Sequence, residues 1–450
     1  MSIDSAVQDY PPEWEMGTDL PGIRPLIAPA RRVLAILVAL DEEAPAAVIA
    51  AHADLSTAAA LRHLQHLSRI GLAVVSKADQ ARYRAAPGPS LLRPAPLNTR
   101  GHAAAIAWRL GSVWEAARML GGAVLPDGEQ FLLDPDRPPY SPANQAEAIA
   151  WFAAERDGLA RELEDASRWG EDQLAWRLGL LMLDVSCFTG PWDGWRRIYE
   201  RAMAAARRVH NRSAQALADE LAGKLELTYG DLAASRDHQH RALRMRTDDH
   251  DSLGVVRSLN ALGLTFLRDR AWREAGELFE QVLETARNLG DEQFETFALL
   301  NLGAVHAASG EHQQAVVELE SAIDRLRAAG RDAYIANAMQ DLALAHREAG
   351  DLERADYVAR SAIDAAVKVG IPMFLPGPLI EYARVQQQRG HLRVALALLH
   401  EAREIYAEIG DEVRNSRTQM EIEALAPSVE QVDASGPPTE VLSENDSTAS

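Results

Sequence analysis

Between residues 145 and 426 the apolar side chains recur at helical spacing, and glycines interrupt the pattern at regular intervals. The segment 252–267 is predicted to form one helix and 272–289 a second, which ends at Gly290. Glycine at that position suits a left-handed helix C-cap. The pattern therefore predicts pairs of antiparallel helices joined by short turns.

These pairs repeat with a period of 40 residues. Turn positions at this step are Gly190, Gly230, Arg270, Gly310, Gly350 and Gly390, and a second series is Gly290, Gly330, Gly370 and Gly410, preceded by Gly170 and His210. Small residues recur in the same way at Gly223, Gly263, Gly303, Ala343 and Ala383, and at Ser235, Ala275, Ala315, Ala355 and Ala395. We expect them where two helices approach closely. An all-α solenoid of about six pairs, beginning with a lone helix near 145–168, follows from this repeat.

One unit carries Leu262, Gly263, Phe266, Ala275 and Phe279, and this order of large and small residues resembles the tetratricopeptide repeat. The usual period of that repeat is 34 residues. Longer helices or turns are therefore expected here. The resemblance implies a superhelix whose concave face is lined by the first helix of each pair.

The N-terminal region 24–100 has a different pattern. Helices are predicted at 31–40, 44–52 and 55–69, followed by short strands at 72–75 and 81–83. The run from 54 to 87 resembles the recognition helix and wing of a winged helix. That resemblance implies candidate nucleic-acid contacts at Ser56, Thr57, Arg62, His63, His66 and Arg69 on the helix and at Lys77, Arg82 and Arg84 on the wing. The alternative, which we favour, is a protein-docking or intramolecular role, because nothing specifies the dimer that a symmetric operator needs.

The order of parts suggests a wider relationship. The winged-helix-like region is followed by a helix, a Pro-rich linker within 101–144, the segment AEAIAWFAAERDGL at 146–159, and the long-period repeats. This order is similar to the C-terminal half of the large antibiotic-regulator proteins of actinobacteria in the STAND class of ATPases, which implies a role linked to secondary metabolism. The chain departs from those proteins because it has no phosphate loop: Gly223-Lys224 is followed by Leu225. We expect no nucleotide and no other cofactor.

Charge changes this picture in one respect. The chain of 450 residues has 66 Asp+Glu against 46 Lys+Arg, a net charge of -20, which argues against a simple nucleic-acid binder. Region 24–100 nevertheless has a net charge of +5, while 1–23 and 427–450 are predicted to be disordered acidic tails. The charge distribution therefore argues against DNA binding by the repeats but not against DNA binding by region 24–100.

Sequence motifs for catalysis or metal binding are missing. There is no G-x-S-x-G or H-E-x-x-H, and His238 and His240 are spaced to lie on different faces of a helix. The single Cys187 excludes a disulfide framework and indicates a reducing compartment. No secretory signal or membrane-spanning run is found, so we expect a cytoplasmic protein without a metal or membrane partner.

The predicted groove supplies the candidate binding residues. Arginine, lysine, asparagine and glutamine dominate them, and these side chains suit carboxylates, phosphates or a peptide backbone. The set consists of Arg177, Lys224, Arg257, Asn260, Asn337, Gln340, Arg347, Arg384 and Gln387. The alternative for each is a solvated position. In the last full repeat, three prolines in 370–378 are expected to prevent helix up to about 379 and to leave Met373, Phe374 and Leu375 in a loop, as core plugs or as an apolar hook.

We therefore expect a non-enzymatic regulatory or scaffold protein that binds a peptide, a protein or a small acidic ligand in its concave groove. A DNA-binding regulator with the repeats as sensor is the first alternative. An atypical enzyme with its site in the groove is the second.

Overall fold

The computed structural model describes residues 28–40, 43–76, 82–86, 99–122, 125, 138–189 and 192–435. The predicted tail at 1–23, Lys77 and much of the predicted linker lie outside these residues. The chain divides into two compact units, which we describe separately: unit 1 comprises Met1–Val185 and Gly194–Ala218, and unit 2 comprises Ser186–Asp193 and Asp219–Ser450. No helix in the described part of the chain has the length and apolar character to cross a membrane.

Unit 1 begins with three helices and a small sheet. The elements are α1 (Ala28–Leu40), β1 (Ala44–Pro45), α2 (Ala46–Ala53), α3 (Thr57–Arg69), β2 (Ala73–Val75) and β3 (Arg82–Ala85). The strands are antiparallel in the order β1-β3-β2, with Ala44 opposite Tyr83 and Val75 opposite the same tyrosine. The prediction of a helix from residue 44 is wrong, because Pro45 lies on an edge strand, where its missing N–H costs no ladder hydrogen bond.

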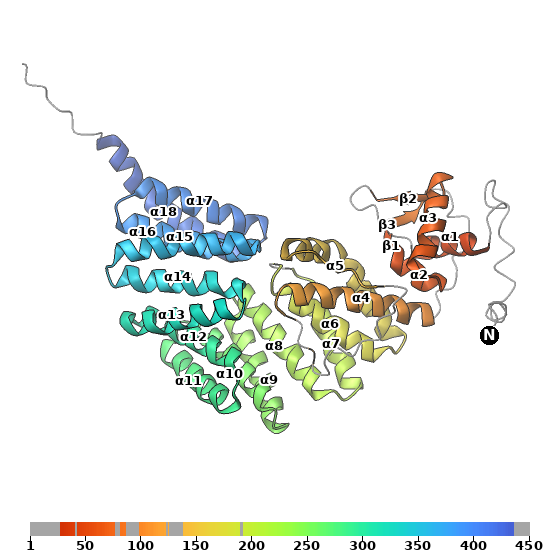
Figure 1. The fold of residues 1–450 in the computed structure, drawn as a ribbon, viewed down its shortest axis with the longest axis horizontal. Coiled ribbons are helices and arrows are strands. Elements are labelled where there is room, and N and C mark those ends of the chain that lie inside the picture. Colours follow the sequence, from red (N-terminus) through yellow and green to blue (C-terminus); the bar gives the residue numbers. More distant parts are fainter. Residues whose placement is uncertain are drawn as a thin grey trace, which may run out of the picture. The chain divides into compact units, whose positions relative to one another are not determined.

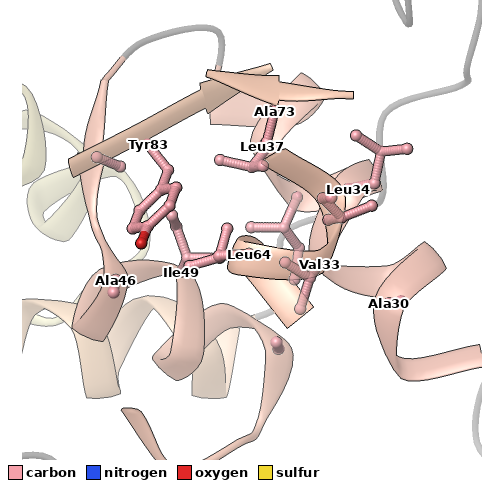
Figure 2. Packing of buried hydrophobic residues seen from close by; sticks show 13 residues of the cluster. Ala30, Val33, Leu34, Leu37, Ala46, Ile49, Leu64, Ala73 and Tyr83 are labelled. Carbon is pink, nitrogen blue, oxygen red and sulfur yellow. The ribbon is translucent and has the colours of Figure 1, made fainter. Parts of the chain in front are cut away.

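One apolar cluster holds these elements together (Figure 2). Leu34 and Leu37 of α1, Ile49 of α2 and Leu64 of α3 pack beneath the sheet, and the ring of Tyr83 comes from β3. All five side chains are almost fully buried. The helical spacing of the apolar residues thus orients each helix towards one common core.

The rest of unit 1 is helical. It contains α4 (Thr99–Met119), α5 (Gln145–Arg168), α6 (Asp172–Ser186), α7 (Trp195–Arg208) and the start of α8 (Arg212–Tyr229). Between α4 and α5, the buried Arg109 donates to Glu155 at 2.6 Å and to Glu162 at 2.8 Å. Arg82 of β3 forms an ion pair with the same Glu155. A buried carboxylate therefore joins the small sheet to the helical part of this unit.

Unit 2 is a tandem array of helix pairs (Figure 1). After α8 it consists of α9 (Leu232–Asp248), α10 (Ser252–Arg268), α11 (Trp272–Leu289), α12 (Glu292–Ser309), α13 (His312–Ala328), α14 (Asp332–Glu348), α15 (Leu352–Val369), the 3-10 turn η4 (Pro372–Phe374), α16 (Pro376–Gln388), α17 (Leu392–Glu408) and α18 (Glu412–Ser435). The predicted all-α solenoid is confirmed. The helix expected near 145–168 is present as α5, in unit 1, where it packs against α4.

The turns keep the predicted period closely. Left-handed residues occur every twenty positions from 210 to 410, and glycine occupies most of these positions. His210, His250 and Arg270 adopt the same conformation without being glycine, at φ 54°, 56° and 59°. The period of 40 is therefore two helices of 17 or 18 residues, each closed by a left-handed joint.

The recurrent small residues lie where helices meet, as predicted. A Cβ on Gly263 would lie 2.5 Å from the ring of Phe279, and one on Gly303 would lie 2.6 Å from Leu319. Ala275 and Ala315, their partners on the second helices, are fully buried. The first and second helix of each pair thus approach too closely for a larger side chain.

Two predicted boundaries in the last repeats are wrong. α16 already begins at Pro376, because proline is tolerated in the first helical turn, where its missing N–H has no intrahelical acceptor. Phe374 lies half-buried in η4, which packs back against α14, α16 and α17, so the core-plug alternative fits better than an exposed hook. α18 continues past Ala426, through Pro427, to Ser435, beyond the predicted start of the C-terminal tail.

Candidate ligand-binding groove

The first helix of each pair forms one layer of unit 2. Among the described residues, α10 contacts α12, α12 contacts α14, and α14 contacts α16, in addition to the contacts between sequence neighbours. An ion pair of Arg257 on α10 with Glu220 on α8 extends this layer by one helix. Helices that pack this closely form the inner side of a curved stack, which is the layer that the sequence predicted to line the groove.

A cluster of charged side chains lies at the α8 end of this inner layer. Glu220 is buried, with its side chain 2% exposed, and Lys224 Nζ and Arg257 Nη2 lie 2.7 and 3.2 Å from its Oε1. Arg246 of α9 approaches the other oxygen at 2.7 Å and donates to Ser258 Oγ at 2.8 Å. Three cationic groups therefore surround one carboxylate.

The two sides of this cluster differ in exposure. Arg246 is buried, whereas the side chains of Lys224 and Arg257 are 39% and 20% exposed. Burial raises the pKa of Glu220, but Arg257, Lys224 and Arg246 outweigh burial and hold that pKa well below its ordinary range. The carboxylate is thus ionised, and Lys224 and Arg257 are the partly exposed cations of the cluster.

Amide side chains occupy the middle of the inner layer. Asn301 of α12 donates to Asn260 of α10 at 2.8 Å, which leaves the NH₂ group of Asn260 available. Asn337 and Gln340 follow on α14, exposed and half-buried respectively, and among the described residues neither side chain has a hydrogen-bond partner. These amides can both donate to and accept from a peptide backbone.

Carboxyl groups occupy the next part of the layer, on α14 and α16. Glu381 is buried and accepts from Arg347 Nε at 2.7 Å. Burial and then Glu381 raise the pKa of Asp341 to about 7. Within the described part of the chain, no hydrogen bond or ion pair involves the Asp341 carboxyl. Arg347 is itself buried and also pairs with Glu348, so its predicted role as a ligand contact becomes a structural one.

A pocket of about 220 Å³ lies at the α18 end of the inner layer. Two predicted groove residues, Arg384 and Gln387, are among its lining, which also includes Ala383, Leu399, Glu421, Ala424 and Leu425. Arg384 Nη2 donates to Glu421 Oε1 at 2.8 Å, with both side chains about two-fifths exposed. The ion pair and the amide of Gln387 thus give the pocket a polar side in addition to its apolar residues.

Not every predicted groove residue belongs to this layer. Arg177 lies on α6 in unit 1, where it donates to Gln173 and covers the ring of Trp176 at 4.4 Å. Conversely, sequence reasoning missed Arg246, because it comes from a second helix, and Asn301, which lies one residue away from the predicted register position. His238, which lacks the spacing of a metal ligand, is bonded to Asp219 at 2.7 Å.

The predicted nucleic-acid contacts of unit 1 separate into two groups, the first on α3. Ser56 caps this helix by accepting from the Ala59 N–H at 3.3 Å, and Thr57 is its first residue. Arg62, His66 and Arg69 are exposed on one face. Beside them His63 is half-buried, and burial, Arg62 and His66 lower its pKa.

The two described wing residues pair with acidic residues, and Arg84 remains about half exposed. Arg82 donates to the Glu43 carbonyl at 2.8 Å and pairs with buried Glu155, and Arg84 lies 3.7 Å from Glu43. Lys77 lies outside the described residues. The side chain of Arg82 is thus engaged within unit 1, and α3 carries the exposed cationic face.

Comparison with known proteins agrees with the repeat assignment. The tetratricopeptide repeat model matches residues 295–366, so the chain contains tetratricopeptide repeats. A comparison with curated proteins finds no match. The fold is an all-α tetratricopeptide-repeat solenoid.

Solved structures similar to this chain include several repeat proteins. A STAND protein with a tetratricopeptide repeat sensor from Pyrococcus horikoshii is 11% identical, with 92% of this chain and 65% of that chain covered and a TM-score of 0.44. Yeast Tom70 is 14% identical, with 86% and 82% covered and a TM-score of 0.39. Aspartyl phosphate phosphatase F from Bacillus subtilis is 12% identical, with 71% and 94% covered and a TM-score of 0.43. At these identities the similarity concerns the fold alone.

Proposed function

We propose that this chain is a regulatory or scaffold protein that binds a peptide or a peptide-like segment of a partner protein along the inner layer of unit 2. The observation that carries the proposal is the row of amides from Asn260 to Gln340. Gln340 is half-buried and lacks a partner within the described part of the chain, although amides shielded from water are usually hydrogen-bonded, and the exposed amide of Asn337 lies one helical turn before it. An extended peptide offers alternating N–H and C=O groups that such a row can satisfy.

A bulky residue in the row provides the test. Peptides are first selected from a displayed random twelve-residue library on the full chain. We expect Asn337→Trp to weaken the selected peptides at least tenfold in fluorescence anisotropy, because the indole occupies the peptide path. Gln313→Trp, at an exposed position of α13 on a second helix, serves as the matched control. Equal binding by both variants would place the site outside the inner layer.

A second candidate function is DNA binding through α3. Its support is the exposed cationic face of Arg62, His66 and Arg69, together with an order of elements, α1-β1-α2-α3-β2-β3, that fits the winged-helix resemblance. A salt-dependent shift of duplex DNA by the full chain, lost in Arg62→Gln and Arg69→Gln, is the expected result. Persistence of the shift in both variants would exclude this face.

We also propose that the chain acts within secondary metabolism, as the resemblance to antibiotic regulators implies. The segment at 146–159, which forms part of α5, supports this proposal. Deletion of the encoding gene is expected to change the amounts of secondary metabolites and to leave growth in rich medium unchanged. Unchanged metabolite profiles in several media would contradict it.

A further inference from the structure

The charged side chains of the inner layer are separated along its length. At the α8–α10 end, Lys224 and Arg257 lie beside the carboxylate of Glu220, which also pairs with the buried Arg246. The α14–α16 part has Asp341 beside Glu381, and Glu381 pairs with the buried Arg347 at 2.7 Å and with Arg384 at 3.5 Å, whereas no ion pair of Asp341 is found among the described residues. Amide side chains lie on α10, α12 and α14, from one charged group to the other.

We propose that the groove binds an extended peptide with an acidic residue at Lys224 and Arg257 and a basic residue at Asp341, so that the charges of the ligand set its direction. This inference rests on the proposed peptide-binding function and adds the class of ligand and its orientation.

The acidic end of the ligand follows from the arrangement around Glu220. Lys224 Nζ and Arg257 Nη2 are held near one oxygen atom, so the two cations are close enough for one carboxylate to contact both. Arg246 pairs with Glu220 from the buried side, so Lys224 and Arg257 are not the only cations that balance this carboxylate. We propose that the group bound here is a carboxylate rather than a phosphate, because the neighbouring amides of Asn260 and Asn301 suit a peptide backbone.

The basic end follows from Asp341. Its carboxyl is half-buried, lies beside a second acidic group and has no partner among the described residues. Burial and the neighbouring Glu381 raise its pKa, while Arg347 and Arg384 pair with Glu381. A ligand lysine, arginine or terminal amine at this position supplies the missing charge and favours the ionised carboxylate.

The spacing of the two charges can be derived from helix packing. Neighbouring packed helices lie about 9 Å apart, so three steps from the α8–α10 position to the α14–α16 position cover about 27 Å. An extended chain advances about 3.3 Å per residue. The acidic and basic residues of the ligand should therefore be separated by about eight positions.

The test uses the twelve-residue library selected on the full chain. We expect enriched peptides to carry an acidic and a basic residue about eight positions apart, and their binding to weaken with salt. Lys224→Gln and Arg257→Gln should each reduce affinity about tenfold, and Asp341→Asn should do the same. Arg273→Gln, which removes an exposed i,i+4 ion pair on α11, is the control and should change nothing. Circular dichroism verifies that each variant keeps its helix content.

A double-mutant cycle makes the assignment specific. Replacing the acidic residue of the peptide by glutamine should weaken binding to the wild-type chain about tenfold and should have little further effect on Lys224→Gln. If the losses of affinity from the peptide change and from Lys224→Gln are additive, the acidic residue of the peptide does not contact Lys224. Enriched peptides that lose affinity on Asn337→Trp but have no charge pair would overturn the proposed orientation and leave the peptide-binding function intact. If no peptide is enriched over the Asn337→Trp protein, both proposals fail.

Discussion

Replacing Asp341 by asparagine should stabilise the array at alkaline pH and leave its stability unchanged in acid. The carboxyl has a pKa of about 7 in the folded chain and an ordinary value of 3.8. Between these values the folded state holds a proton that the unfolded state has lost. The free energy of unfolding therefore falls as pH rises from about 4 to about 7, and the destabilisation by the ionised carboxylate reaches its full size above pH 7.

The size of the effect follows from the same two values. At 1.36 kcal/mol for each pKa unit, the difference between 3.8 and about 7 amounts to about 4 kcal/mol for a fully shielded carboxyl. Asp341 is half-buried, and solvent screening reduces the expected gain at pH 8 to about 2 kcal/mol. The asparagine has the same shape and no charge, so this gain should vanish near pH 4.

Urea denaturation followed by far-UV circular dichroism at pH 4, 6 and 8 measures this difference. Asp364→Asn, at an exposed position of α15, is the matched control and should show no dependence of this kind. If Asp341→Asn is as stable as the wild type at pH 8, or if the difference between them is equal at pH 4 and 8, the carboxyl is not shielded as the structure indicates.

Three further predictions concern helix packing, backbone conformation and a buried ion pair. Gly263→Ala should lower the free energy of unfolding by about 1–2 kcal/mol, because its Cβ would lie 2.5 Å from the Phe279 ring. Gly276→Ala should raise it by up to about 1 kcal/mol, because its Cβ would make only an ordinary contact. Urea titrations should therefore give changes of opposite sign for the two variants. Arg270→Gly should stabilise by roughly 0.5–1 kcal/mol, because φ is 59° and the left-handed strain exceeds the entropy cost of glycine; a lower melting temperature would contradict this. Glu155→Gln should destabilise unit 1 by about 2 kcal/mol, since it removes the charge shared by Arg82 and the buried Arg109 and leaves Arg109 with Glu162 alone, and faster limited proteolysis of residues 28–185 measures the loss.

The repeat architecture was predictable because its signals are local. A left-handed joint requires glycine or a tolerant residue, and close helix contacts require small side chains, so both constraints recur in the sequence at the structural period. The misplaced boundaries have local causes as well. Pro376 reads as a helix breaker in isolation, yet it is acceptable as the first residue of α16.

The groove was predictable only in part, because its chemistry depends on side chains from different helices. The repeat register placed Lys224 and Arg257 on the inner layer, but it could not reveal that both approach one buried glutamate. Arg82 shows the opposite case. Its position suggested a wing contact, and its actual partner Glu155 lies 73 positions away in the chain, where no sequence pattern indicates it.

The equal spacing of the left-handed joints makes the array a modular structure whose length can change in whole units. Removal of residues 291–330 would delete α12 and α13 and connect Gly290 to Arg331, so one joint replaces another with the same geometry. Gain or loss of a 40-residue segment during evolution therefore preserves every remaining helix interface. Such a change alters the number of inner helices between the two charged ends of the groove, and with it the length of peptide that both ends can hold at once.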